Sequence, residues 1–239
     1  MITKSAVIDF YADKANGVHR YNTEEFFKRE AEEKLFHMGS GSSLFDFGCG
    51  TGDLLVYYST AFQAMSGVDI SANMVQRARQ RLDEFGLESV NVAQADEANV
   101  WSVVGDSKFD VITSAGVMQY LSVSQMEGFL GSARMHLLPG GRIAMFDLVD
   151  PRLYWLFKYG WFNERPLDPM LVVRSLMKTG RVLGRKLLRS LAGRPEDHMG
   201  FSHHPVVVQR AAERNGFQCR IVCSMYYEYR YHALLIPLE

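Results

Sequence analysis

The sequence predicts an α/β protein whose single domain, 1–239, contains a doubly wound and mostly parallel sheet. Strand-like apolar runs alternate with segments of helical periodicity up to about residue 150, and this pattern is typical of parallel strands joined by helical crossovers. A glycine-rich loop follows the first of these strands. Hydrophobic residues make up 47% of the 239 positions and charged residues 22%, as in ordinary globular domains.

Five apolar segments have the length and the flanking residues of strands. They are LFDFG (44–48), AMSGVDI (64–70), VNVAQAD (90–96), FDVITSAG (109–116) and RIAMFDLV (142–149). A turn is expected at LLPGG, just before the fifth strand. Near the end of the chain, FQCRIVCSMYYEY and RYHALLIPL are expected to form a hairpin, which brings the sheet to seven strands.

The segments between these strands have helical spacing and residues that begin or end helices. Two helices are expected to begin and end at Ser71 and Gly86, and at Pro205 and Gly216. Two others are expected to begin with the residue pairs Asn22 with Glu25, and Ser122 with Gln125. Asn22 with Glu25 and Ser122 with Gln125 have the spacing of capping boxes.

Composition excludes several classes of protein. No stretch approaches the roughly eighteen apolar residues of a membrane-spanning helix, and the N-terminus becomes polar too early for a secretory signal. The three cysteines Cys49, Cys219 and Cys223 suit neither a disulfide framework nor zinc knuckles. We therefore expect a cytoplasmic protein with reduced thiols. The sequence pI of about 6.7 gives no indication of nucleic-acid binding.

The loop DFGCGTGD differs from a dinucleotide-binding loop in two ways. Its glycines, Gly48, Gly50 and Gly52, stand at every second position, so the third comes one residue earlier than in GxGxxG. Asp53 follows directly, and an acidic side chain in the first turn of a helix would repel a pyrophosphate. The loop therefore favours a ligand without phosphates.

Two carboxylates are expected at the same edge of the sheet. Asp69 follows the second strand, where it can accept hydrogen bonds from both hydroxyls of a ribose. Asp96 follows the third strand, where it can accept from the exocyclic amine of adenine. Together with the glycine loop, they predict a phosphate-free adenosine ligand.

At this point the sequence resembles the class I S-adenosylmethionine-dependent methyltransferases. DFGCGTG is similar to their glycine loop, GVDIS to the acidic end of their second strand and AQAD to their adenine contact. FDVITSAGVMQYL and HLLPGGRIAMFD resemble their fourth-strand and fifth-strand segments. The resemblance implies a Rossmann-like methyltransferase fold whose seven-stranded sheet has an antiparallel last strand. It also implies S-adenosylmethionine as the cofactor and S-adenosylhomocysteine as its product.

The resemblance assigns roles to individual residues. The expected cofactor-binding residues are Asp46, Gly48, Cys49, Gly50 and Gly52 in the loop, Asp69, Ile70, Met74, Asp96 and Glu97 around the adenosine, and Ser114 near the reactive end. Tyr11, His19, Tyr21 and Met118 are expected as substrate or lid residues. For Asp46 and Asp110, the alternative is a carboxylate that caps a neighbouring loop.

Methyl transfer needs a general base when the acceptor is a hydroxyl or a protonated amine. His203 and His204 precede the last helix and are the expected catalytic residues. The alternative is that one of them caps that helix and the other is solvated. Their spacing to His198 and Asp197 matches no metal-ligand motif, so no metal is expected.

The chain divides into four segments. They are an N-terminal lid and helix (1–38), a cofactor-binding core (40–150), a helical insert (151–200), and a C-terminal helix with hairpin (201–239). The insert is aromatic and basic, whereas residues 1–150 are acidic on balance. It suits an acidic or lipid-like acceptor, or peripheral membrane contact through 171–192. A helical cover whose apolar face closes the pocket is the favoured interpretation.

Methyl transfer by in-line displacement to oxygen, nitrogen or carbon of a small molecule is thus the first hypothesis. A nicotinamide-dependent oxidoreductase is the alternative from another enzyme class, but the glycine spacing and the PGG turn disfavour it. A methyltransferase-like binding or scaffold domain without turnover is the non-enzymatic alternative. The sequence leaves the acceptor and the oligomeric state open.

Overall fold

The computed structural model describes residues 23–161, 170–191 and 200–239. Tyr11, His19 and Tyr21, the expected lid residues, lie outside the described residues, as do Asp197 and His198.

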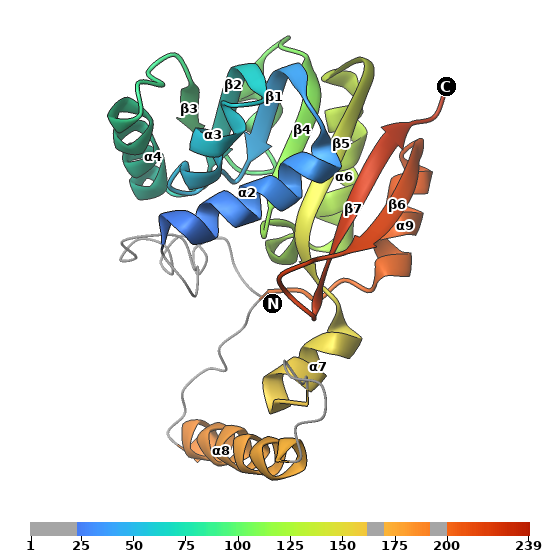
Figure 1. The fold of residues 1–239 in the computed structure, drawn as a ribbon. Coiled ribbons are helices and arrows are strands. Elements are labelled where there is room, and N and C mark those ends of the chain that lie inside the picture. Colours follow the sequence, from blue (N-terminus) through green and yellow to red (C-terminus); the bar gives the residue numbers. More distant parts are fainter. Residues whose placement is uncertain (1–22, 162–169, 192–199) are drawn as a thin grey trace.

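A seven-stranded sheet forms the centre of the molecule (Figure 1), with the strand order β3-β2-β1-β4-β5-β7-β6. The strands are β1 (Gly41–Phe47), β2 (Phe62–Asp69), β3 (Asn91–Gln94), β4 (Phe109–Ala115), β5 (Leu137–Val149), β6 (Phe217–Cys223) and β7 (Arg230–Pro237). Strands β1 to β5 pair in parallel, and β7 is antiparallel to both β5 and β6. The predicted fold class, including the antiparallel last strand, is confirmed.

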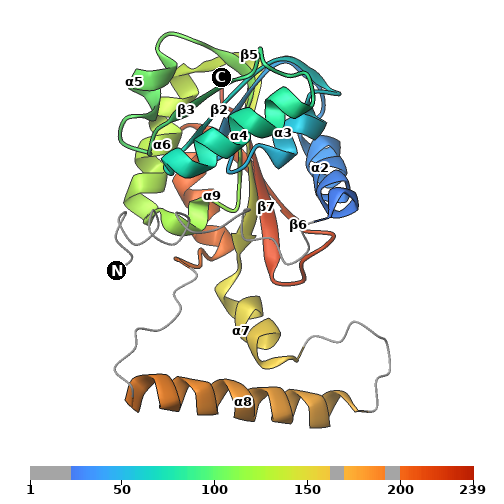
Figure 2. The ribbon, with the colours of Figure 1, turned by 90° about the vertical axis from the view of Figure 1, so that its left-hand side faces the viewer.

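Helices cover both faces of this sheet, as the two views show (Figures 1 and 2). On one face lie α2 (Glu24–Met38), α3 (Asp53–Tyr58) and α4 (Ala72–Glu84), and on the other α5 (Val100–Val104), α6 (Val123–Met135) and α9 (Pro205–Arg214). Each layer buries its own apolar cluster against the sheet. The burial of aliphatic and aromatic side chains in both clusters supplies the main driving force for this arrangement.

Most predicted helix ends are confirmed by hydrogen bonds. The Ser71 hydroxyl accepts from the Met74 amide, and Ser122 with Gln125 forms the expected capping box. The start of α2 differs, because Thr23 caps it by accepting from the Phe26 amide. The prediction of Asn22 with Glu25 was therefore wrong by one residue, since Thr23 has the short hydroxyl side chain that suits the same role.

Two other local predictions need correction. The LLPGG segment belongs to β5, which begins at Leu137 instead of after a turn. A short 3-10 helix, η1 (Met118–Tyr120), follows β4, and α5 was not predicted because its five residues are too few to show helical periodicity.

The insert contains α7 (Pro151–Tyr159) and α8 (Leu171–Leu191). We call these two helices, together with Gly160, Trp161 and Met170, the α7–α8 appendage. Helix α7 begins where β5 ends, and Asp150 caps it by accepting from the Arg152 amide at 2.8 Å. The Ser175 hydroxyl donates to the Gly160 carbonyl and joins α8 to α7. Figures 1 and 2 both show α8 standing away from the sheet, with α7 between them.

Within residues 23–161, 170–191 and 200–239, the apolar face of α8 closes no pocket, contrary to the favoured interpretation of the sequence. Val172, Leu176, Leu183 and Leu187 are all exposed. Among the described residues, none of the helices is both long enough and apolar enough to span a bilayer.

Candidate active site

The glycine loop connects the carboxyl end of β1 to α3. Gly48, Gly50 and Gly52 have φ angles of 81°, 56° and 77°, a region that side chains other than glycine rarely adopt. The amides of Gly48 and Cys49 donate to the Val68 carbonyl at 2.7 and 2.9 Å. These bonds hold the loop against the end of β2.

The three glycines have different surroundings. A Cβ at Gly48 would lie 2.2 Å from Cγ2 of Val117, and one at Gly52 would lie 3.3 Å from the backbone of Ala78 in α4. These two positions therefore need glycine for packing within the protein. A Cβ at Gly50 would have nothing within 4 Å. The open side of the loop is at Gly50, where a ligand can approach the backbone.

Asp69, at the end of β2, shapes this loop. Its Oδ2 accepts from the Gly50 amide at 3.0 Å, and its Oδ1 accepts from the Ser71 amide at 2.9 Å. Burial raises the pKa of Asp69, while these two amides act in the opposite direction. Each carboxylate oxygen can accept a second hydrogen bond. One side chain can thus position the loop and receive hydroxyl groups of a ligand.

The predicted neighbours of Asp69 continue into α4. Ile70 is half-buried, and its carbonyl accepts from the Gln94 side chain at 3.0 Å. Met74 is buried in the first turn of α4. Ile70 follows β2 directly and contacts Gln94 of β3, whereas Met74 lies within α4.

Asp46 is a buried carboxylate in the last part of β1. Its Oδ1 has no hydrogen-bond partner among the described residues, and burial raises its pKa to about 7, with Asp69 adding to the rise and Lys34 opposing it. Asp110 is different, because its Oδ2 accepts from the Ser42 and Ser43 amides, both at 2.8 Å. The capping alternative is therefore confirmed for Asp110. Oδ1 of Asp46, by contrast, can accept a hydrogen bond from a ligand.

This elevated pKa predicts a pH dependence of folding stability. A carboxyl whose pKa rises from 3.8 to about 7 on folding binds protons more tightly in the folded state, so stability falls as the pH rises through that interval. Asp46→Asn is expected to remove this loss, of which roughly 2–3 kcal/mol falls between about pH 5 and about pH 8. Urea unfolding of both proteins from about pH 5 to about pH 8 measures it. If the free energy of unfolding changed with pH in the same way for both proteins, Asp46 would not titrate as described.

Asp96 and Glu97 follow β3. Oδ1 of Asp96 accepts from the amides of Ala98 and Asn99, at 2.8 and 3.1 Å, and so shapes the turn into α5. Oε1 of Glu97 accepts from the Gln125 side chain at 2.7 Å. Both side chains therefore have structural partners on the side of the sheet that α5 and α6 cover.

Ser114 and Cys49 are both buried near the carboxyl ends of the central strands. The Ser114 hydroxyl, in β4, has no hydrogen-bond partner among the described residues. Burial raises the pKa of the Cys49 thiol well above its ordinary value, and the neighbouring carboxylates Asp69 and Asp46 raise it further. Cys49 is thus an unreactive thiol, since the thiolate is the nucleophilic form.

The two histidines before α9 have structural contacts. His203 is buried, and its Nε2 lies 3.0 Å from the carbonyls of both Met118 and Leu121, so this nitrogen carries a proton and donates it. His204 caps α9 by accepting from the Val206 amide at its Nδ1. The Met118 side chain lies in the core. The capping alternative describes His204, but His203 is buried instead of solvated.

Comparisons with known proteins agree with this geometry. Residues 45–143 match the family model of a methyltransferase domain. A demethylmenaquinone methyltransferase from Tropheryma whipplei is 29% identical over 59% of this chain and 56% of its own length. A ubiquinone/menaquinone biosynthesis C-methyltransferase from Methylococcus capsulatus is 35% identical over 56% of this chain and 52% of its own length. Residues 45–143 of this chain are thus similar to a methyltransferase domain.

The structural likeness extends further than the sequence likeness to these methyltransferases. The magnesium protoporphyrin IX methyltransferase from Synechocystis, solved with bound S-adenosylhomocysteine, has a TM-score of 0.59 and covers 98% of each chain at 17% identity. This likeness shows a shared fold. The chain spans about half the length of the curated methyltransferases that it matches.

In this methyltransferase fold, a buried charge cluster that the sequence did not predict joins α2 to β5. Nζ of Lys34, in α2, is 2.9 Å from Oδ2 of Asp147 in β5 and 3.7 Å from Oε1 of Glu30. Asp147 has a φ of 60°, a conformation that costs energy outside glycine. Lys34 also contributes to the pKa of Asp46. The cluster thus connects α2 electrostatically to the carboxyl end of β1.

Glu33, His37 and His232 place three groups that can hold a metal within 4.8 Å of one another. The Asp147 amide donates to Nδ1 of His232 at 3.1 Å, so that nitrogen carries no proton and Nε2 does. Nε2 lies 3.1 Å from Oε1 of Glu33 and donates to it. His232 thus links the Asp147 amide to Glu33 in a hydrogen-bonded chain, and its Nε2 would have to release its proton to bind a metal.

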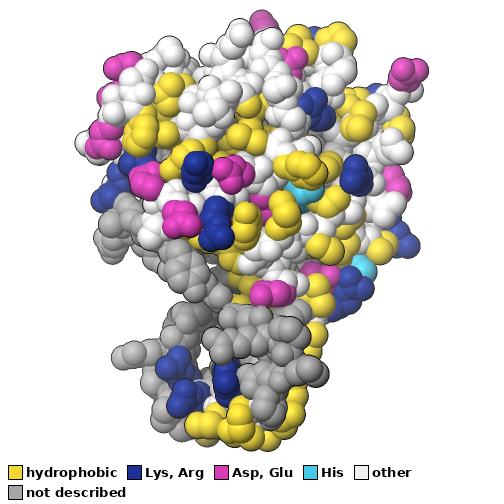
Figure 3. All heavy atoms as spheres, in the orientation of Figure 1, with side chains coloured by type: hydrophobic (Ala, Val, Ile, Leu, Met, Phe, Trp, Pro, Cys, Tyr) yellow, Lys and Arg dark blue, Asp and Glu magenta, His cyan; other side chains and the backbone are white. Residues whose placement is uncertain are grey.

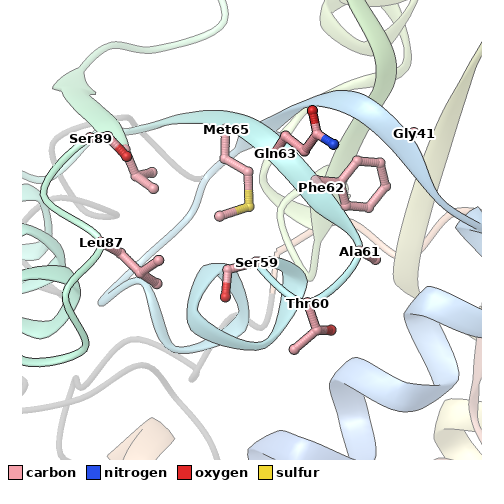
Figure 4. A pocket seen from close by; sticks show the side chains of 10 residues that line it. Gly41, Ser59, Thr60, Ala61, Phe62, Gln63, Met65, Leu87 and Ser89 are labelled. Carbon is pink, nitrogen blue, oxygen red and sulfur yellow. The ribbon is translucent and has the colours of Figure 1, made fainter.

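The hollow in Figure 4 has a volume of about 460 Å³ and lies near the amino ends of β1 and β2, at the opposite end of these strands from the glycine loop. Its lining includes Gly41, Phe62 and Met65 and contains no acidic, basic or thiol side chain. It therefore offers no group that could act in methyl transfer.

Proposed function

We propose that this protein transfers the methyl group of S-adenosylmethionine to oxygen, nitrogen or carbon of a small molecule. The open side of Gly50 next to the Asp69 carboxylate carries the proposal. An adenosine ligand without phosphates suits this loop for two reasons. Its ribose hydroxyls can donate to Asp69, and the ligand can approach the protein backbone closely at Gly50. The match of residues 45–143 to a methyltransferase domain supports the same cofactor.

The protein's part in this reaction is to bind and align. The cofactor supplies an activated methyl group when it is bound. Asp69 would hold the ribose, and Asp46 would receive the amino group of the methionine portion, which suits a buried carboxylate with an unpartnered oxygen. Asp96 and Glu97 would lie beside the adenine. Ser114 would lie near the acceptor, where alignment at attack distance lowers the barrier.

A hydroxyl or ammonium acceptor also requires a group that takes up its proton. His203 is the stronger of the two candidates. Its Nε2 donates to backbone carbonyls, so Nδ1 is its basic atom in the neutral ring. His204 uses Nδ1 to cap α9 and would lose this bond if it accepted a proton.

The acceptor in this proposal is a small molecule of acidic or lipid-like character. The names of two relatives, a demethylmenaquinone methyltransferase and a ubiquinone/menaquinone biosynthesis C-methyltransferase, support a lipid-like acceptor. We place the reaction in the cytoplasm, because Cys49, Cys219 and Cys223 are all free thiols, as is usual in reducing compartments.

Replacing Gly50 with alanine tests the cofactor site, and Gly86→Ala is the matched control. Both glycines have positive φ angles, 56° and 69°, and a Cβ at either position would meet nothing within 4 Å. Each substitution is therefore expected to cost about 1–2 kcal/mol of stability through backbone strain. Gly50→Ala alone is expected to weaken S-adenosylhomocysteine binding, by roughly 10- to 100-fold, because its methyl group would occupy ligand space.

Isothermal titration calorimetry of the two variants separates these effects. Equal affinities for S-adenosylhomocysteine in both folded variants would show that the ligand does not approach Gly50, and would contradict the proposed site.

A further inference from the structure

The α7–α8 appendage presents a surface that the proposed methyl transfer does not use. In α8, Val172, Leu176, Leu183 and Leu187 recur at spacings of four, seven and four residues, which places them on one face of the helix. The three leucines are 58%, 51% and 62% exposed. Four exposed aliphatic side chains in one row form an apolar strip that the described residues leave uncovered.

The opposite face of α8 is basic. Arg174, Lys178, Arg181 and Arg185 are also spaced by three or four residues, and all four are exposed. No acidic residue occurs between Asp168 and Glu196 in the sequence. In Figure 3, hydrophobic side chains form the outer rim of α8, and basic side chains lie on its inner side, toward the body. The helix therefore combines an outward apolar strip with a basic opposite face.

Helix α7 adds aromatic side chains to this surface. Trp155 and Trp161 are exposed, as is Leu156. Trp155 stacks on Tyr159, with ring centroids 5.6 Å apart, and the Lys158 ammonium lies 5.3 Å from the Trp155 ring. Tryptophan beside lysine or arginine is a combination that favours the boundary between lipid headgroups and acyl chains.

We propose that the α7–α8 appendage docks this protein on the surface of an anionic lipid bilayer. The leucine strip enters the outer part of the acyl region, and the basic side chains of α8 remain within reach of the anionic headgroups. The bilayer is favoured over a second copy of the chain, because tryptophan beside lysine and a basic face opposite the leucines suit the boundary between lipid and water. The contact is peripheral, since the described helices include none that could span a bilayer.

Docking through this surface does not depend on the proposed methyl transfer. The appendage begins at the carboxyl end of β5, which is the same edge of the sheet as the glycine loop. Docking would therefore turn that edge toward the lipid. Failure of vesicle binding and failure of cofactor binding are separate observations, made with different ligands.

Co-sedimentation of the full chain with vesicles tests the proposal. We expect binding to vesicles of phosphatidylcholine mixed with phosphatidylglycerol, much weaker binding to phosphatidylcholine alone, and a decrease as salt is added, because salt screens the headgroup attraction. The combined variant Leu176→Asp, Leu183→Asp and Leu187→Asp is expected to lower the partition coefficient at least about 10-fold.

A matched control carries the same change in charge elsewhere. Phe36→Asp, Met135→Asp and Leu238→Asp also replace three exposed apolar side chains, but on the body of the protein. This control is expected to keep most of the vesicle binding. Equal loss in the two variants would show that net charge alone governs binding, and would overturn the role of the leucine strip.

The same samples also test whether the leucine strip binds a different partner. Dimers of the wild-type chain that the α8 variant dissociates, together with no vesicle binding, would assign the strip to a second copy. A monomer that binds no vesicles would also overturn the proposal. Circular dichroism and thermal unfolding of each variant establish that it is folded.

Discussion

Replacing Asp69 with alanine is expected to weaken the binding of S-adenosylhomocysteine by at least about 100-fold. Two losses contribute. The ribose hydroxyls lose a charged acceptor, at about 1.5–3 kcal/mol per hydrogen bond, and the Gly50 amide loses the carboxylate oxygen that holds it at 3.0 Å. The second loss loosens the loop that the ligand must approach. Binding should therefore fall by more than the ribose contacts alone account for.

The measurement is isothermal titration calorimetry of the variant, with thermal unfolding as a check that it is folded. Asp83→Ala is the matched control, because Asp83 is an exposed carboxylate on the adjacent helix α4. It is expected to bind S-adenosylhomocysteine like the wild type. If folded Asp69→Ala protein kept the wild-type affinity, Asp69 would have no role in binding this ligand.

Replacing Lys34 with methionine is expected to destabilise the protein by about 3–5 kcal/mol, the usual cost of removing one partner from a buried ion pair. Lys34 is fully buried and lies 2.9 Å from Asp147, which is also buried. Without the ammonium, Asp147 and Glu30 would both be carboxylates in a site of low polarity, with no lysine between them. Methionine retains the volume of the side chain, so the loss reports mainly on charge.

Urea unfolding measures this loss, and Lys28→Met is the control, because Lys28 is exposed on the same helix. The control is expected to change stability by no more than about 0.5 kcal/mol. The pKa of Asp147 is lowered and that of Lys34 is raised, in both cases by the opposite charge. The stabilisation is therefore present between their ordinary pKa values of 3.8 and 10.5. A loss below about 1 kcal/mol would mean that the pair adds little to folding.

The features that the sequence predicted correctly are local. Ser71 and the pair Ser122 with Gln125 begin helices because a short polar side chain can reach an amide three residues ahead. The glycine loop is found where the spacing places it, since Gly48, Gly50 and Gly52 all have the positive φ angles that glycine permits. Alternation of strands and helices was sufficient to predict the sheet.

One feature that the sequence did not predict depends on residues far apart in the chain. Nothing near Lys34 indicates that it pairs with Asp147, because the contact exists only once α2 packs against β5. The Asn99 and Ala98 amides occupy Oδ1 of Asp96, a local contact that the adenine prediction overlooked. The amphipathic pattern of α8 identified a helix with one apolar face, but a pattern of this kind does not specify which partner the face meets.

The measurement that tests the central claim most directly is calorimetric titration of the wild-type protein with S-adenosylhomocysteine, with NAD as the parallel ligand. The geometry at Gly50, Asp69 and Asp46 predicts binding of S-adenosylhomocysteine in the micromolar range and no binding of NAD, whose pyrophosphate would face Asp53 in the first turn of α3. Binding of NAD alone, or of neither ligand by folded protein, would contradict the assignment of this loop to S-adenosylmethionine.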